Sequence, residues 1–182
     1  MDQLARALWQ QFGAAIDTLG NAIKACPESL WRESLWTYPL DVEWPSGLAD
    51  FWYLAYHTLF WIDLYLFGTG DGFVPRPPFT DAELDPAGKL PDEPYTREEL
   101  LEYVTYVRNK CETTLTSMTE DAATRPCKFP WSRGETVTYY ELQIYNLRHI
   151  QEHAAQLGMF LGQRQPGSAG GWVARADRNA RA

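Results

Sequence analysis

Three histidines are the residues of this chain best suited to binding a metal ion. His57, His149 and His153 are its only histidines. His149 and His153 are four residues apart, so on one helix both imidazoles point to the same side and can reach one ion. Three neutral imidazoles occupy one side of a divalent cation and leave positions for water or substrate, which is the layout of a catalytic site. The alternative is that the three rings are hydrogen-bonded core residues.

The ligand types leave the metal open, because zinc, nickel, iron and cobalt all accept imidazole. Other metal and phosphate motifs are incomplete. The segment from His149 to His153 matches the HxxEH string of inverted zinc peptidases, but Asp177 is the only acid after it that could supply their further ligand. The residue three before each histidine is Leu, Asn or Ile, where the ferritin type has Glu. The sequence contains no glycine-rich phosphate-binding loop.

Composition narrows the class of protein. The 182 residues suit one domain with a sizeable core. A formal net charge of −8 is expected to repel phosphate backbones, which disfavours nucleic-acid binding. The longest apolar stretch, residues 51–67, is interrupted by His57 and Asp63 and is short for a bilayer span, so no membrane association is expected. The N-terminus does not resemble a secretory signal, and three widely spaced cysteines without a CxxC motif indicate reduced thiols in the cytoplasm.

Apolar residues recur every three or four positions in four segments, which predicts four long helices. The predicted ranges are 3–25, 47–67, 96–119 and 138–163. Ser46 is placed to cap the second helix. Thr96 with Glu99 forms a capping-box pattern at the third helix, and Thr138 with Glu141 forms another at the fourth.

These elements predict an all-α fold, a four-helix bundle with long connecting loops. The proline-rich residues 69–95 are expected to form a surface crossover, with a lid or pocket wall as the alternative. Residues 121–135 are expected to form a second loop. The bundle domain is predicted over residues 1–164, followed by a flexible tail at 165–182. The midpoints of the second and fourth helices should lie at similar depth, so the three histidine rings can meet inside the bundle.

The order of these elements resembles the DinB/YfiT-like family of metalloenzymes. The resemblance rests on an amphipathic first helix, the stretch WYLAYH that ends at His57, and RHIQEHAAQL at residues 148–157, and it covers about residues 1–164. The family implies a four-helix bundle, a three-histidine metal site and frequently a homodimer. Carried onto this sequence, its metal ligands are His57, His149 and His153.

Helix geometry places further side chains within about one turn of these ligands, and they are Tyr53, Asn146, Glu152 and Gln156. Glu152 is a candidate catalytic base or orienting acceptor, and Tyr53 is the second candidate catalytic residue. Each is more often a packing or surface residue. The candidate pocket walls are Trp52, Trp61 and Tyr145, although aromatic residues at helical spacing usually belong to the core.

The leading hypothesis is a metal-dependent enzyme that acts on a small molecule. Relatives in the resembled family include thiol-dependent transferases and isomerases, in which a low-molecular-weight thiol such as bacillithiol or mycothiol joins an electrophile. A divalent ion favours thiolate over thiol and so supplies a nucleophile near neutral pH. The alternatives are a metal-dependent hydrolase that uses bound water and a non-catalytic, dimeric binding bundle.

Overall fold

The apolar periodicity of the sequence is realised as helices that pack along their lengths. The computed structural model describes residues 3–37, 47–86, 88–167 and 171–176. Within these residues the fold is all-α, with two strands of two residues each. The helices are α1 (Gln3–Ala25), α2 (Phe51–Phe67), α3 (Arg97–Thr116), α4 (Glu120–Thr124) and α5 (Tyr139–Arg164). Shorter elements connect them: η1 (Glu28–Leu30), η2 (Ala82–Leu84), β1 (Pro126–Cys127), η3 (Pro130–Ser132) and β2 (Val137–Thr138).

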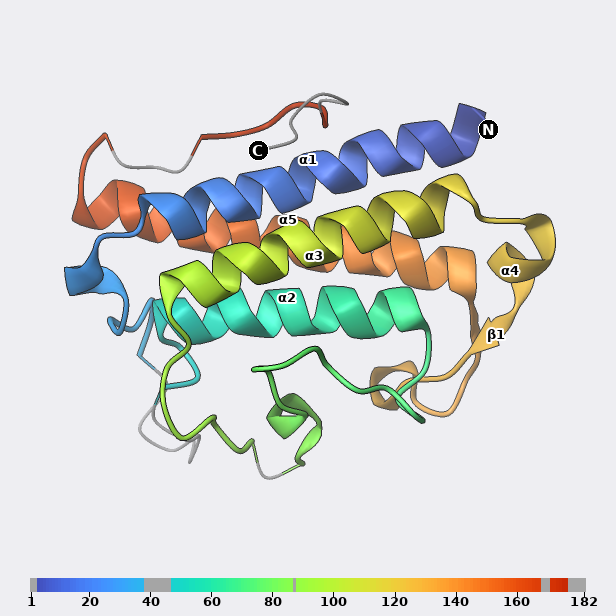
Figure 1. Cartoon of the computed structure of the whole chain (residues 1–182), viewed down its shortest axis with the longest axis horizontal. Helices are drawn as coiled ribbons and strands as arrows, with labels where there is room; N and C mark the ends of the chain where they lie inside the picture. Colours follow the sequence, from blue (N-terminus) through green and yellow to red (C-terminus); the bar gives the residue numbers. More distant parts are fainter. Residues whose placement is uncertain (1–2, 38–46, 87, 168–170, 177–182) are drawn as a thin grey trace.

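The four long helices lie side by side (Figure 1). α1 packs against α3 and α5, and α2 packs against the same two helices. α1 and α5 run in one direction, and α2 and α3 run in the other (Figure 1). Every residue of α2 is buried except His57, Trp61 and Phe67. The nearly continuous apolar sequence of α2 is therefore explained by its packing, and His57 and Trp61 mark the part of its middle that is left uncovered.

α2 begins at Phe51, four residues later than predicted. Residues 47–50 instead form a turn bonded to the preceding connector, where the amide of Leu35 donates to the carbonyl of Ala49 at 2.8 Å. These bonds hold the segment outside the helix. The predicted cap, Ser46, lies outside the described residues.

The end of α2 follows the sequence prediction. Gly68 has a left-handed backbone with φ of 92°, a conformation that glycine adopts without strain. A Cβ atom built on Gly68 would overlap the guanidinium of Arg125. That guanidinium donates to the carbonyl of Phe67 at 3.1 Å and so binds one of the free carbonyls at the helix end.

The predicted starts of α3 and α5 are confirmed by their caps. The capping box of Thr96 is complete, and the hydroxyl of Thr138 accepts from the amide of Glu141 at 3.1 Å. α3 ends at Thr116, earlier than predicted, because Thr119 caps the separate helix α4. The expected loop at residues 121–135 is therefore structured in part, with α4, η3 and an antiparallel pairing of β1 with β2.

The crossover between α2 and α3 is tied to both helices. The hydroxyl of Tyr56 donates to the carbonyl of Thr80 at 2.9 Å. Phe79 stacks on Tyr103 of α3, with 4.1 Å between ring centroids and 17° between planes. These contacts fix the backbone just before η2.

Residues 171–176 lie along α1 (Figure 1). The amide of Val173 donates to the hydroxyl of Thr18 at 3.1 Å, and the amide of Ala176 donates to the carbonyl of Gln10 at 3.0 Å. The division into a domain at 1–164 and a tail at 165–182 stays a prediction. None of the described helices is long and apolar enough to cross a membrane.

A buried ion pair joins α2 to α3. The carboxylate of Asp63 is 1% exposed; it pairs with the ammonium of Lys110 and accepts from the hydroxyl of Tyr103 at 3.0 Å. Lys110 also donates to the carbonyl of Asp63 at 3.2 Å. Removing the carboxylate leaves the buried hydroxyl of Tyr103 without its acceptor and the mostly buried ammonium of Lys110 without its counterion.

We expect Asp63→Ala to lower the free energy of unfolding by about 3 kcal/mol, because the hydroxyl of Tyr103 loses its acceptor and the ammonium of Lys110 loses its counterion. Urea denaturation of the metal-free protein measures the change. Asp71→Ala is the matched control, because Asp71 is exposed. A loss for Asp63→Ala no larger than that of the control would contradict this account.

Candidate metal centre

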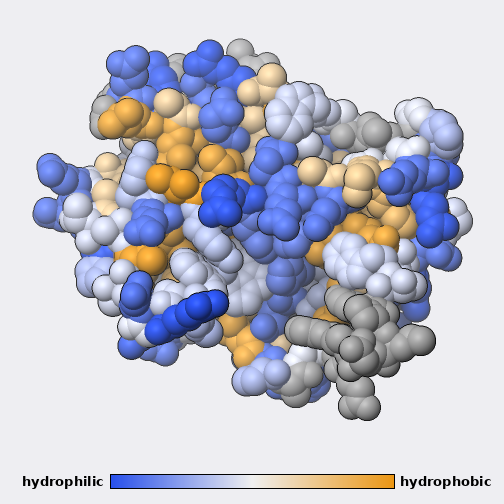
Figure 2. Space-filling view, turned by 180° about the vertical axis from the view of Figure 1, so that it is seen from behind, coloured by the Kyte–Doolittle hydropathy of each residue, from blue (hydrophilic) through white to orange (hydrophobic). Residues whose placement is uncertain are grey.

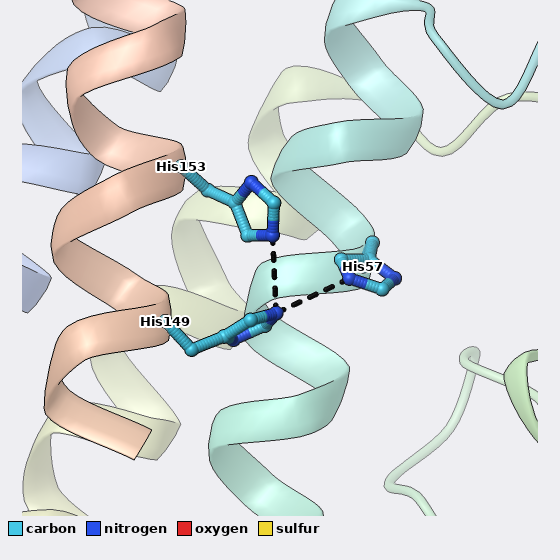
Figure 3. A group of neighbouring side chains, drawn as sticks. All are labelled: His57, His149 and His153. Atoms are coloured by element: carbon cyan, nitrogen blue, oxygen red, sulfur yellow. Dashed lines mark hydrogen bonds between the residues drawn. The ribbon is translucent and has the colours of Figure 1, made fainter. Parts of the chain in front are cut away.

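The three histidines expected as ligands meet between two antiparallel helices (Figure 3). His57 lies in the middle of α2, and His149 and His153 lie one turn apart on α5. The Nε2 atom of His149 is 3.2 Å from Nε2 of His57 and 3.1 Å from Nε2 of His153. One nitrogen from each ring lies within 4.8 Å of the other two. The residues that the sequence separates by some 90 positions are therefore neighbours in space.

Two of the rings have an acceptor on their opposite nitrogen. Nδ1 of His57 lies 2.8 Å from Oε2 of Glu83, and Nδ1 of His153 lies 2.7 Å from Oε1 of Gln156. Ionised carboxylates and amide oxygens only accept hydrogen bonds, so both Nδ1 atoms donate. When the rings of His57 and His153 are in the neutral form that binds a metal ion, Nε2 is left with a lone pair that faces the third histidine.

The donor set fits a divalent metal ion. Converging lone pairs repel one another unless a proton or a cation lies between them, and a single proton can bridge only one pair of nitrogens. Tetrahedral zinc with Zn–N bonds of about 2.0–2.1 Å places its nitrogen ligands about 3.3 Å apart. The observed separations of 3.1 and 3.2 Å are close to this value. Nδ1 of His149 is buried without a hydrogen-bond partner among the described residues.

Burial favours the neutral form of two histidines. Burial, followed by the nearby rings of His57 and His153, lowers the pKa of His149 from 6.5 to about 2. Burial and then His57 also lower the pKa of His153, against the opposing effect of its hydrogen bond to Gln156. Metal ions bind neutral imidazole, so these two rings keep their ligand form below the pH at which free histidine is protonated.

A carboxylate that was not expected from the sequence lies beside His57. Glu83 belongs to η2, and only 4% of its side chain is exposed. Its Oε2 accepts hydrogen bonds from Nδ1 of His57 and from Nε1 of Trp61, each at 2.8 Å. Burial acts to raise the pKa of Glu83, but His57 and hydrogen bonds from His57, Tyr53 and Trp61 together lower it. Glu83 lies in a proline-rich segment without periodicity, and the only signal was that such a crossover can form a pocket wall.

The structure brings some of the expected accessory side chains to the site and leaves others away from it. Gln156 contacts His153 directly. Tyr53 is buried, its ring centroid is 6.3 Å from that of His57, and it hydrogen-bonds to Glu83. Asn146 is buried and donates to the carbonyl of Ile62 at 3.5 Å, so it joins α5 to α2.

Glu152 is exposed on α5, and it makes no hydrogen bond or ion pair within the described part of the chain. Its charge still acts to raise the pKa of the adjacent His153. The catalytic roles expected for Glu152 and Tyr53 stay predictions.

Of the three aromatic residues expected to line a pocket, two border the histidines. The ring of Trp61 is 6.1 Å from that of His57, and the ring of Tyr145 is 6.5 Å from that of His149 and nearly parallel to it. Trp52 is 4% exposed and packs into the core. Its ring contacts are with other aromatic residues and not with the histidines.

The segment between β1 and β2 adds a further aromatic side chain to those that lie beside the histidines. Trp131 of η3 stacks on Tyr145 with 4.2 Å between centroids and donates from Nε1 to the hydroxyl of Tyr65 at 3.1 Å. The ring of Tyr65 is in turn 6.3 Å from that of His149. Figure 2 looks onto the side where α5 lies and shows hydrophilic residues in a band through its middle, with hydrophobic patches to either side.

An all-α fold with three converging imidazoles fits a metal-binding protein. Comparison with protein families matches residues 11–157 to the DinB superfamily. The chain belongs to this superfamily, and the resemblance inferred from its sequence motifs is confirmed. The matched range includes all three histidines. Comparisons with curated proteins and with solved structures give no match.

We expect the metal-free protein to lose stability as the pH falls from 6.5 toward 4.5. Histidines of the unfolded chain titrate near pH 6.5, whereas the folded-state pKa is about 2 for His149 and lowered for His153. The unfolded state therefore binds more protons in this window, and the free energy of unfolding falls by up to about 1.4 kcal/mol per pH unit for each histidine. The lowered pKa of Glu83 adds stability that is lost only below its ordinary value of 4.5.

Urea denaturation at pH 7, 6 and 5 in the presence of a chelator measures this slope. His149→Gln removes one of the two titrating groups, so its stability should depend less steeply on pH. An equal slope in the variant and the wild type would contradict the assignment.

Proposed function

We propose that this protein is a metal-dependent enzyme in which His57, His149 and His153 bind one divalent ion of zinc, nickel or iron. The observation that carries the proposal is the convergence of three Nε2 atoms, two of them left with lone pairs by acceptors behind the rings. Three protein ligands leave coordination positions open, as in catalytic rather than structural sites. The side chain of His57 is 27% exposed, which is consistent with access from solvent.

The residues around the ligands have separable roles in this proposal. Glu83 and Gln156 hold the rings of His57 and His153 with Nδ1 protonated, so that Nε2 faces the ion. Trp61 and Tyr145 border the histidines and provide apolar surface for the non-reacting part of a substrate. Tyr53 and Glu152 are the proposed catalytic side chains, with Glu152 at the solvent side of α5 as an acceptor for a substrate proton.

We propose a small-molecule substrate and a low-molecular-weight thiol as cosubstrate, in a transferase or isomerase reaction. A bound divalent ion supplies chemistry that favours thiolate over thiol near neutral pH. Support comes from membership of the DinB superfamily and from the thiol-dependent relatives that the sequence resembles. Within the chain, the aromatic rings of Trp61 and Tyr145 beside the histidines provide an apolar surface for the non-polar part of an electrophile.

Other features belong to the same proposal. The four long helices form a four-helix bundle of the DinB type, residues 1–164 make the domain, and residues 165–182 make its tail. Two chains associate as a homodimer, and the protein works in the cytoplasm without nucleic-acid or membrane partners. Size-exclusion chromatography with light scattering measures the oligomeric state directly.

Elemental analysis of the purified, untagged protein is the first test. We expect about one equivalent of a transition metal in the wild type and its loss in His149→Ala, because two imidazoles bind more weakly than three. Glu152→Gln is the matched control on the same helix and should keep its metal. Absence of metal from the wild type, even after incubation with zinc, nickel or iron, would refute the metal site.

The reaction class is tested on the metal-loaded protein with a thiol and a panel of electrophiles. We expect thiol to be consumed at a rate that falls at least about 100-fold in His57→Ala. Turnover that needs no thiol would indicate the hydrolase alternative. A His57→Ala variant that changes stability or binding without abolishing any turnover would instead indicate a non-catalytic bundle.

A further inference from the structure

The crossover between α2 and α3 extends one buried carboxylate, Glu83, to the metal site. His153 has its Nδ1 partner, Gln156, on its own helix, and Nδ1 of His149 has none among the described residues. His57 differs from both, because its Nδ1 partner comes from the separate element η2. The orientation of the His57 ring therefore depends on where the crossover lies.

We infer that Glu83 is a positioning residue that couples the crossover to metal binding, an inference that rests on the metal site proposed above. By accepting from Nδ1 at 2.8 Å, Glu83 selects the tautomer of His57 whose Nε2 lone pair faces His149. It also fixes the rotation of the ring. Acceptors in this place behind metal-binding histidines change metal affinity by about 10- to 100-fold.

The position of Glu83 is set by the fold and not only by its own hydrogen bonds. The backbone before η2 is held by the hydrogen bond from Tyr56 to Thr80 and by the stacking of Phe79 on Tyr103. A carboxylate with 4% exposure is stable only with donors around it, since its water shell has been removed. Here His57 is one of those donors, so ring and carboxylate hold each other in place.

Coupling between two such sites is reciprocal. If the crossover holds His57 in the metal-binding orientation and so raises metal affinity, a bound ion that fixes His57 must stabilise the crossover by the same factor. The amides of Leu84 and Asp85 donate to carbonyls of Asp81 and Ala82 within this segment, at 2.8 and 3.0 Å. Their hydrogen exchange reports the opening of the crossover.

The test measures zinc affinity of the full-length protein by competition with a chromophoric chelator. We expect Glu83→Ala to weaken zinc binding about 10- to 100-fold. Glu83→Gln keeps an acceptor oxygen and should recover part of the loss. Trp61→Phe removes the other hydrogen bond on Oε2 but leaves the contact with His57, so its effect should be much smaller. Glu152→Gln controls for the loss of a nearby negative charge.

Hydrogen exchange supplies a second readout that a purely structural role would not move. Zinc should slow exchange at Leu84 and Asp85 in the wild type and leave it unchanged in Glu83→Ala. Equal zinc affinity in the wild type and Glu83→Ala, or a loss in Trp61→Phe as large as in Glu83→Ala, would overturn the inference and leave the metal site standing. A wild type that binds none of zinc, nickel and iron would remove the metal site itself, and the coupling with it.

Discussion

The register between α2 and α5 is the constraint on which the rest of the site depends. Gln143 of α5 donates to the carbonyl of Tyr65 of α2 at 2.8 Å, and near the other end Phe51 packs against Phe160. Gln143 is fully buried, so displacement of one helix by a turn would leave its amide without an acceptor in the core. This register is what sets His57 beside the facing pair on α5.

The sequence predicted the parts of the molecule that depend on local patterns. Helix periodicity, the caps at Thr96 and Thr138, and the spacing of the histidines on α5 are all short-range features. They were enough to predict the helices and the clustering of the histidines. Glu83 could not be found in this way, because its place beside His57 depends on how a proline-rich crossover folds back across α2. The late start of α2 had a similar origin, since hydrogen bonds to residues distant in sequence override a segment's helical preference.

The site brings together polar groups whose close packing and burial would be unfavourable without the surrounding core. Three imidazoles share a small volume, and one buried nitrogen of His149 lacks a partner within the described residues. The surrounding core of large aromatic and aliphatic side chains supplies the stability that such a cluster lacks. Side chains that already converge in this way need little rearrangement to hold an ion, a property that favours affinity and a defined coordination geometry.

The three histidines belong to helices, whereas two of the side chains around them belong to connecting segments. Glu83 comes from the crossover, and Trp131 comes from the segment between β1 and β2. Connectors tolerate insertions and substitutions better than packed helices do. Sequence drift in these two segments, at positions other than Glu83, can thus reshape the approach to the cluster while the histidines keep their places on the helices. An arrangement of this kind lets one scaffold diversify over evolutionary time, and it identifies the same two segments, with Glu83 kept unchanged, as the places to randomise in a directed-evolution library.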